Sequence, residues 1–155
     1  MNAKAPILIY AFEVRAEVAP PIEIGRTPRG TRRVVPIIGG TFEGGELKGR
    51  ILAGGADWQL IHDDGFTELD SRYTLETDSG DVIAVRNRGV RHAPPHVMAR
   101  LLAGEPVDPS LVYFATTPTF ETAAPHLGWL TRSMFVGIGQ RQPSSVLIQF
   151  WKIGP

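Results

Sequence analysis

The segment Thr67-Glu68-Leu69-Asp70-Ser71-Arg72-Tyr73-Thr74-Leu75-Glu76-Thr77 alternates apolar and polar side chains along its length. Leu69, Tyr73 and Leu75 share one parity, whereas Asp70 and Arg72 share the other. Because successive side chains of a β-strand point to opposite faces, this pattern predicts a strand. If the sheet closes into a barrel, one of these faces lines the interior and the other points outward.

Similar short segments recur along nearly the whole chain, separated by Gly, Pro and Asp turns. About ten strands at this spacing are typical of a sandwich or barrel. We expect an all-β fold, a single closed and mostly antiparallel β-barrel, because closure leaves no exposed sheet edges. The expected strands are Ile7 to Val18, Ile22 to Gly25, Arg32 to Phe42, Leu47 to Ala53, Asp57 to His62, Thr67 to Thr77, Val82 to Gly89, Leu111 to Phe120, Ser133 to Gln140 and Val146 to Ile153.

Turn and helix signals complete this pattern. Asp63-Asp64-Gly65, Asp78-Ser79-Gly80 and Glu43-Gly44-Gly45 each supply a residue that tolerates positive φ. Pro95 to Gly104 has a Pro start, a Val97 and Leu101 pair and a Gly stop, which predicts one short helix. A second helical turn is expected near Pro125 to Thr131.

Composition bounds the class of protein. The 155 residues suit one domain, residues 1–155, and 16 basic residues balance 16 acidic ones, so nothing in the charge favours nucleic acid or membrane as a partner. The chain has no cysteine, which excludes disulfides and thiolate chemistry, and no apolar run long enough to span a bilayer. We expect a cytoplasmic protein.

The last expected strand, Val146 to Ile153, is apolar on both parities. A strand packed on both sides would need this pattern. Part of the barrel exterior is therefore expected to be covered, either by the helix at Pro95 to Gly104 or by another subunit of a homo-oligomer.

Asp57 stands in the block Gly54-Gly55-Ala56-Asp57-Trp58-Gln59, directly after a glycine pair that lets the backbone turn or bulge. Aspartate is rare in strands, so the presence of Asp57 in an expected strand indicates a specific role. One interpretation is a turn residue bonded to backbone amides. The other is a general acid or base, or a ligand-binding carboxylate, in a partly dry cavity.

Arg72 is the candidate cation. It shares a face with Asp70 and is either solvated or, inside a barrel, in need of a carboxylate such as Asp57 or Glu121. Glu121 ends a threonine-rich segment and is otherwise an exposed strand end. Tyr73 lies next to Arg72 and joins the candidate ligand contacts.

Trp129 and Arg132 could form a stacked platform for a flat ligand, although a tryptophan of this kind more often plugs a barrel end. The four histidines show no metal-ligand spacing, because Pro94 and Pro95 separate His92 from His96. The basic run from Arg86 to His92 is interpreted as a solvated loop, although an anionic ligand could use it. We expect neither metal nor cofactor.

Together these motifs resemble a bacterial and fungal domain-of-unknown-function family, number three-two-three-seven. The resemblance implies a closed β-barrel, often a homo-oligomer, with no established general activity. One departure is Thr131, where the family pattern has Asn, so the role of the segment Trp129 to Arg132 is open. The resemblance rests on Pro36 to Gly44, Gly54 to Gln59, Leu69 to Tyr73, Phe120 to Thr122 and Trp129 to Arg132, and the matching positions are Asp57, Trp58, Arg72, Glu121, Trp129 and Arg132.

Three functions fit these residues. The first is a cofactor-free acid/base enzyme, an isomerase, lyase or hydrolase, acting on a small, partly apolar carbonyl or carboxylate compound. In it Asp57 or Glu121 moves a proton, Arg72 holds an oxyanion, and Trp58 and Trp129 pack the ligand. The second is a non-catalytic carrier or sensor, and the third is a structural barrel without a ligand.

Overall fold

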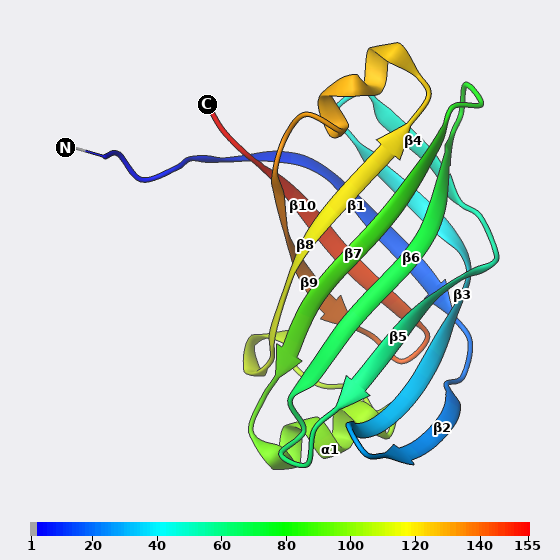
Figure 1. Cartoon of the computed structure of the whole chain (residues 1–155), viewed down its shortest axis with the longest axis vertical. Coiled ribbons are helices and arrows are strands. Elements are labelled where there is room, and N and C mark those ends of the chain that lie inside the picture. Colours follow the sequence, from blue (N-terminus) through cyan, green and yellow to red (C-terminus); the bar gives the residue numbers. More distant parts are fainter. Residues whose placement is uncertain (1–2) are drawn as a thin grey trace.

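The computed structural model describes residues 3–155, which form a closed barrel of antiparallel β-strands (Figure 1). The expected all-β barrel is confirmed. Along the described chain the elements are β1 (Leu8–Val18), β2 (Ile22–Thr27), β3 (Gly30–Gly44), β4 (Leu47–Ile51), β5 (Gly55–Ile61), β6 (Thr67–Thr77), β7 (Val82–His92), the helix α1 (Pro95–Leu102), the 3-10 helix η1 (Pro109–Leu111), β8 (Tyr113–Thr122), the 3-10 helix η2 (Pro125–Leu130), β9 (Phe135–Arg141) and β10 (Ser145–Ile153).

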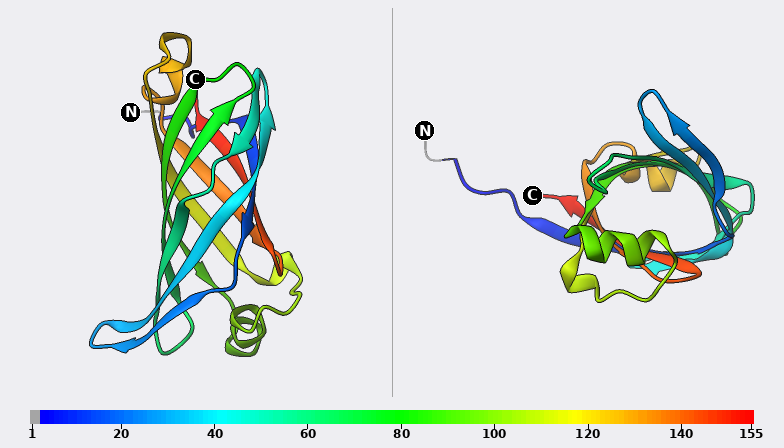
Figure 2. Two further views of the ribbon diagram at one scale, coloured as in Figure 1. Left: turned by 90° about the vertical axis from the view of Figure 1, so that its right-hand side faces the viewer. Right: turned by 90° about the horizontal axis from the view of Figure 1, so that it is seen from below.

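The barrel closes because β1 pairs with β10 on one side and with β3 on the other. From β10 the order runs through β9, β8, β7 and β6 to β4 and β3. β5 also pairs with β3 and β6, beyond the end of β4, so β4 and β5 share one position in the wall. β2 forms a hairpin with β3 that flares away from the wall (Figure 2).

Strand β6 shows how the alternating pattern produces the wall. Leu69, Tyr73 and Leu75 are buried inside, whereas Arg72 is exposed and Asp70 is half-buried on the outside. The apolar parity therefore faces the interior, as expected for a strand with one buried face.

The turn before β5 depends on Gly54, which adopts φ +106°. A residue other than glycine is strained in this left-handed region. Gly55 follows with no room for a side chain, because a Cβ there would lie 2.6 Å from the backbone oxygen of Arg72. Gly54 thus belongs to the turn between β4 and β5, and Gly55 lets the start of β5 lie tightly against β6.

The two ends of the barrel carry different caps (Figure 1). η2, the second expected helical turn, lies at one end and buries Leu127 and Leu130. α1 crosses the opposite end (Figure 2) and buries Val97, Met98 and Leu101. We call these the η2 end and the α1 end.

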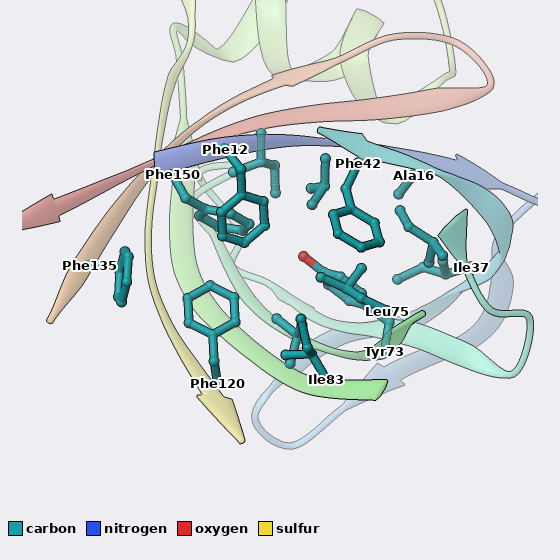
Figure 3. Packing of buried hydrophobic residues seen from close by; sticks show 14 of the residues in the cluster. Phe12, Ala16, Ile37, Phe42, Tyr73, Leu75, Ile83, Phe120, Phe135 and Phe150 are labelled. Carbon is teal, nitrogen blue, oxygen red and sulfur yellow. The ribbon is translucent and has the colours of Figure 1, made fainter. Parts of the chain in front are cut away.

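The half of the interior toward the η2 end is filled by phenylalanine rings (Figure 3). Phe12 packs against Phe150 with ring centroids 5.1 Å apart, and Phe120 packs against Phe135 at the same separation. Phe12 also contacts Phe42 at 6.2 Å. We call these five mutually contacting rings the phenylalanine plug.

α1 does not cover the outer face of β10, so one of the two expectations for this face is wrong. Ile148 and Phe150 are buried inside, but Trp151 is half-buried outside and Ile153 is exposed. Trp151 packs edge-on against Tyr10 of β1, with ring centroids 5.3 Å apart. Since α1 lies across the barrel end, its residues are not available to cover this face, and the homo-oligomer stays a prediction.

In the described part of the chain, residues 3–155, no helix has the length and apolar character needed to cross a membrane.

Candidate functional site

A cavity lined by both apolar and polar side chains occupies the half of the barrel toward the α1 end. Its volume is about 40 Å³, and it adjoins a hollow of about 280 Å³ beneath α1. The two share Val18, Val35, Gln59, Arg91 and Arg141 as lining residues. The cavity alone holds only a few water molecules, whereas cavity and hollow together reach the lower end of the ~300–1,000 Å³ typical of ligand pockets.

Asp57 lies in this cavity and not in a turn. Its neighbours across the sheet are Val35 on β3 and Ser71 on β6. Oδ1 accepts hydrogen bonds from the backbone N of Asp70 at 3.1 Å and from Oγ of Ser71 at 3.0 Å, and Oδ2 accepts one from Nε2 of Gln59 at 2.8 Å. These three donors fix the orientation of the carboxylate.

Burial raises the pKa of Asp57 above the usual carboxyl range, because the charged form is poorly solvated inside the barrel. The hydrogen bonds from Gln59 and Ser71, and the positive charge of Arg91, act in the opposite direction. The net shift is upward, so Asp57 binds a proton more readily than an exposed aspartate does.

The strand register places Asp57 in a polar row. Asp57 on β5, Ser71 on β6 and Asn87 on β7 are consecutive cross-strand neighbours. All three line the cavity. Neighbours on one face of adjacent strands lie about 5 Å apart, so one small molecule can contact all three.

Several buried polar atoms around the cavity have no hydrogen-bond partner among residues 3–155. Such atoms cost roughly 1–3 kcal/mol each when they stay unsatisfied, and native proteins contain few of them. Their concentration in one cavity indicates a site that a polar molecule completes. They are Oε1 of Gln59, the hydroxyl of Tyr73, both amide atoms of Asn87, Nε of Arg91 and Oγ1 of Thr116.

Arg91 is the buried cation of the site, with 3% of its surface exposed. Its guanidinium lies over the ring of Phe114, 5.7 Å from the centroid. Burial lowers its pKa to about 10, with the charge of Asp57 acting against that shift. Arg91 is therefore still cationic at neutral pH.

The structure brings together only part of the predicted site. Asp57 and Tyr73 face the cavity, and the Tyr73 hydroxyl points into the barrel (Figure 3). Burial raises the pKa of Tyr73 further above its usual range, so it remains a neutral donor.

Trp58, Arg72 and Glu121 lie outside the barrel, in an open groove of about 530 Å³ that also includes Arg86. The expectation that Arg72 and Glu121 lie beside Asp57 is therefore wrong. The reason is that successive side chains of a strand face opposite ways. Trp58 directly follows Asp57, and Arg72 directly follows Ser71, so both face away from the cavity. Asp70, outside as well, pairs with Arg86 at 3.1 Å and not with Arg72.

Trp129 and Arg132 lie at the η2 end, separated from the cavity by the phenylalanine plug. Both side chains are exposed, and the Trp129 ring packs against Phe135 at 6.1 Å. They do not form part of the cavity.

Asn87 and Arg91 are cavity residues that the sequence analysis did not select. Both share the parity of Ile83 and Val85 on β7, and that parity was the available signal. The basic run was interpreted as a solvated loop, which is wrong for Arg91 because it belongs to β7 and points inward.

Across residues 3–155, no group of three His, Asp or Glu side chains is arranged to hold a metal ion.

The sequence model for the family described as "Protein of unknown function (DUF3237)" matches residues 6–153. A "UPF0311 protein" of Rhodopseudomonas palustris (strain TIE-1) is 38% identical over 144 residues, covering 93% of this chain and 94% of that protein. The crystal structure of the conserved protein of unknown function RPA1785 from Rhodopseudomonas palustris has a TM-score of 0.94 at 36% identity, covering 98% of this chain and all of that one.

The fold also resembles that of a more distant protein. The crystal structure of an enzyme from Penicillium herquei has a TM-score of 0.74 at 16% identity, with 99% of this chain and 98% of that one covered. At this identity the likeness concerns the fold alone.

Proposed function

We propose that this chain, which belongs to the DUF3237 family, binds a small, partly apolar molecule with oxygen groups in the cavity around Asp57 and acts on it as a cofactor-free acid/base enzyme. The substrate class is a carbonyl or carboxylate compound. The reaction is a proton transfer of the isomerase, lyase or hydrolase kind. The protein is further proposed to be cytoplasmic and homo-oligomeric.

The observation that carries the proposal is the set of unpartnered polar atoms around one carboxylate. Among residues 3–155, the cavity has several such atoms from four strands, whereas the phenylalanine plug contributes none. A barrel needs no such atoms for stability, because apolar side chains fill the same space at no desolvation cost. A bound molecule with oxygen groups would supply the missing partners.

The chemistry follows from the positions of the side chains. Asp57 can take a proton from one atom of the bound molecule and return it to another, so that the enzyme is unchanged after each turnover. The Asn87 amide, the Tyr73 hydroxyl and Arg91 can stabilise the negative charge that develops on an oxygen. Val14, Ile148 and other apolar residues of the cavity would pack the body of the molecule.

A non-catalytic carrier is the second candidate, and one observation favours it. Both oxygens of Asp57 already accept hydrogen bonds from three donors, an arrangement that suits a fixed anchor. In this alternative the same cavity binds the same class of molecule, and Asp57 orients the other polar groups.

The test begins with a thermal-shift screen of small aromatic and carbonyl compounds, both neutral and anionic. Compounds that raise the melting temperature are then incubated with the protein in D₂O, and ¹H NMR follows the loss of carbon-bound protons. Proton exchange reports acid/base chemistry before the overall reaction is known. We expect exchange to be lost in Asp57→Asn with affinity retained.

Glu76→Gln is the matched control, because it removes a carboxylate that pairs with Arg50 on the outside of the barrel. Exchange should persist in this variant. Unchanged exchange in Asp57→Asn would contradict the catalytic role of Asp57. Binding in the wild type with neither exchange nor any chemical change of the bound compound in the NMR spectrum would favour the carrier. Loss of exchange in Glu121→Gln but not in Asp57→Asn would move the site to the outer groove.

A further inference from the structure

Three arginines from three strands meet at the α1 end of the cavity. Arg33 comes from β3, Arg91 from β7 and Arg141 from β9, and all three line the hollow beneath α1. Neighbouring positive charge contributes to the lowered pKa of both Arg91 and Arg141, after burial, which is the larger cause. We call this group the arginine mouth.

Arg33 already has partners. Its NH2 lies 2.6 Å from Oε1 of Glu23, and its NH1 donates to the backbone oxygen of Leu102 in α1 at 3.3 Å. It is thus neutralised at the outer side of the hollow, where it also holds the end of α1 over the opening.

Arg91 and Arg141 lack comparable counter-charges. Arg141 donates to the backbone oxygens of Ser145 and Gln142, which carry no net charge. Arg91 has no ion-pair partner and no side-chain hydrogen bond within residues 3–155. A buried cation without a partner is costly, so this arrangement needs an anion.

Asp57 does not fill this role. Of the described residues, 3–155, it is the only carboxylate that lines either the cavity or the hollow. Its oxygens accept hydrogen bonds from Gln59, Ser71 and the backbone of Asp70, and none of the ion pairs among residues 3–155 joins it to Arg91. Three cations thus face two carboxylates, Glu23 and Asp57, which leaves one excess positive charge.

We propose that the molecule bound in this cavity is a small organic acid whose carboxylate lies in the arginine mouth, between Arg91 and Arg141, while its apolar body extends past Phe114 and Ile148 toward Asp57. This inference rests on the proposed function and specifies its substrate class. A planar carboxylate matches the paired N–H groups of a guanidinium, and a single negative charge balances the excess.

The position of the carboxylate also sets the chemistry. With its charge held at Arg91, the molecule presents its apolar body to the polar row of Asp57, Ser71 and Asn87. A second negative charge nearby disfavours ionisation of Asp57, which raises its pKa further. Binding of the acid would therefore raise the proton affinity of Asp57, which makes its carboxylate a stronger base toward the bound molecule.

The test compares benzoate with benzamide, two molecules of the same shape that differ in charge. We expect benzoate to bind roughly tenfold or more tightly than benzamide to the wild type, because charge-assisted hydrogen bonds are stronger than neutral ones. Isothermal titration calorimetry measures both affinities. Arg91→Met should abolish the preference for benzoate, while its affinity for benzamide stays within a few-fold of the wild-type value. Arg91→Lys should restore part of the benzoate preference.

Arg88→Met is the matched control, because Arg88 belongs to the same strand but is exposed outside the barrel. It should retain the full preference for benzoate. Arg141→Met is the second cavity variant, used if Arg91→Met does not fold, and it should weaken benzoate more than benzamide.

Equal affinities for benzoate and benzamide in the wild type would overturn the inference. A benzoate preference that survives both Arg91→Met and Arg141→Met would also overturn it. Binding and Asp57-dependent exchange of neutral compounds alone would overturn it while the proposed function stood. An Arg91-dependent benzoate preference without exchange in any compound would support the acid-binding site and remove the catalytic role of Asp57.

Discussion

The two halves of the barrel interior are built from the same strands but from different kinds of residue. β7 contributes Ile83 to the apolar half and Asn87 to the polar half, and β6 contributes Leu75 and Ser71 in the same way. The phenylalanine plug carries no polar side-chain atoms and is held together by ring packing, whereas the cavity contains buried polar atoms that have no partner among residues 3–155. Stability is therefore concentrated toward the η2 end, and binding capacity toward the α1 end.

The largest expected effect comes from breaking the plug. Phe150→Ala removes a fully buried ring that contacts Phe12 and Phe120. We expect the free energy of unfolding to fall by about 3–5 kcal/mol, as measured by urea denaturation. Tyr113→Ala, at an exposed ring outside the barrel, should cost far less; an equal loss would contradict the division between the halves.

An apolar replacement of a polar residue in the cavity should raise stability, whereas a truncation in the plug lowers it. Asn87→Leu replaces two unsatisfied amide atoms by an apolar group of similar size, so the free energy of unfolding should rise by roughly 1–3 kcal/mol. Ligand binding should be lost at the same time. The reciprocal change Ile83→Asn, in the apolar half of the same strand, should lower stability. A loss of stability in Asn87→Leu would show that the amide is already satisfied.

The pH dependence of stability should distinguish the interior from the exterior. Because the pKa of Asp57 is raised in the folded state, its stabilising contribution is complete below the usual carboxyl pKa. That contribution is lost as pH rises through the raised value. The difference in melting temperature between Asp57→Asn and the wild type should therefore grow in favour of the variant from acidic to neutral pH, and a flat difference would contradict the raised pKa.

The smallest effect is expected outside the barrel, at the Asp70 and Arg86 ion pair. The Arg86 hydrogen bond lowers the pKa of Asp70, so its contribution is present above the usual carboxyl pKa and is lost as pH falls through the lowered value. Both side chains are more than one-third exposed, and solvent screening keeps Asp70→Asn below about 1 kcal/mol. A double-mutant cycle with Arg86→Met measures the coupling, and a value of several kcal/mol would contradict this assignment.

Much of the fold could be predicted because its signals are local. Alternation in Thr67 to Thr77 identified a strand and its buried parity, and the Gly65 and Gly80 turns adopt the positive φ that their sequences predict. α1 begins at Pro95 as expected and ends at Leu102, before Gly104. The site was harder to predict, because a barrel interior can be either apolar or polar. The sequence therefore left open whether the charged face of β6, with Arg72, points into the barrel.

The sequence by itself determined the strands, their turns and the all-β class, since a period of two and the φ preference of glycine act over a few residues. Only the tertiary structure decided that Asp57, Asn87, Arg91 and Thr116 share one cavity and that Arg72 and Glu121 do not. That outcome depends on the register of strands distant in sequence and on which buried atoms find partners. Both are properties of the closed barrel as a whole, because a one-residue change of register moves a side chain from the interior to the surface.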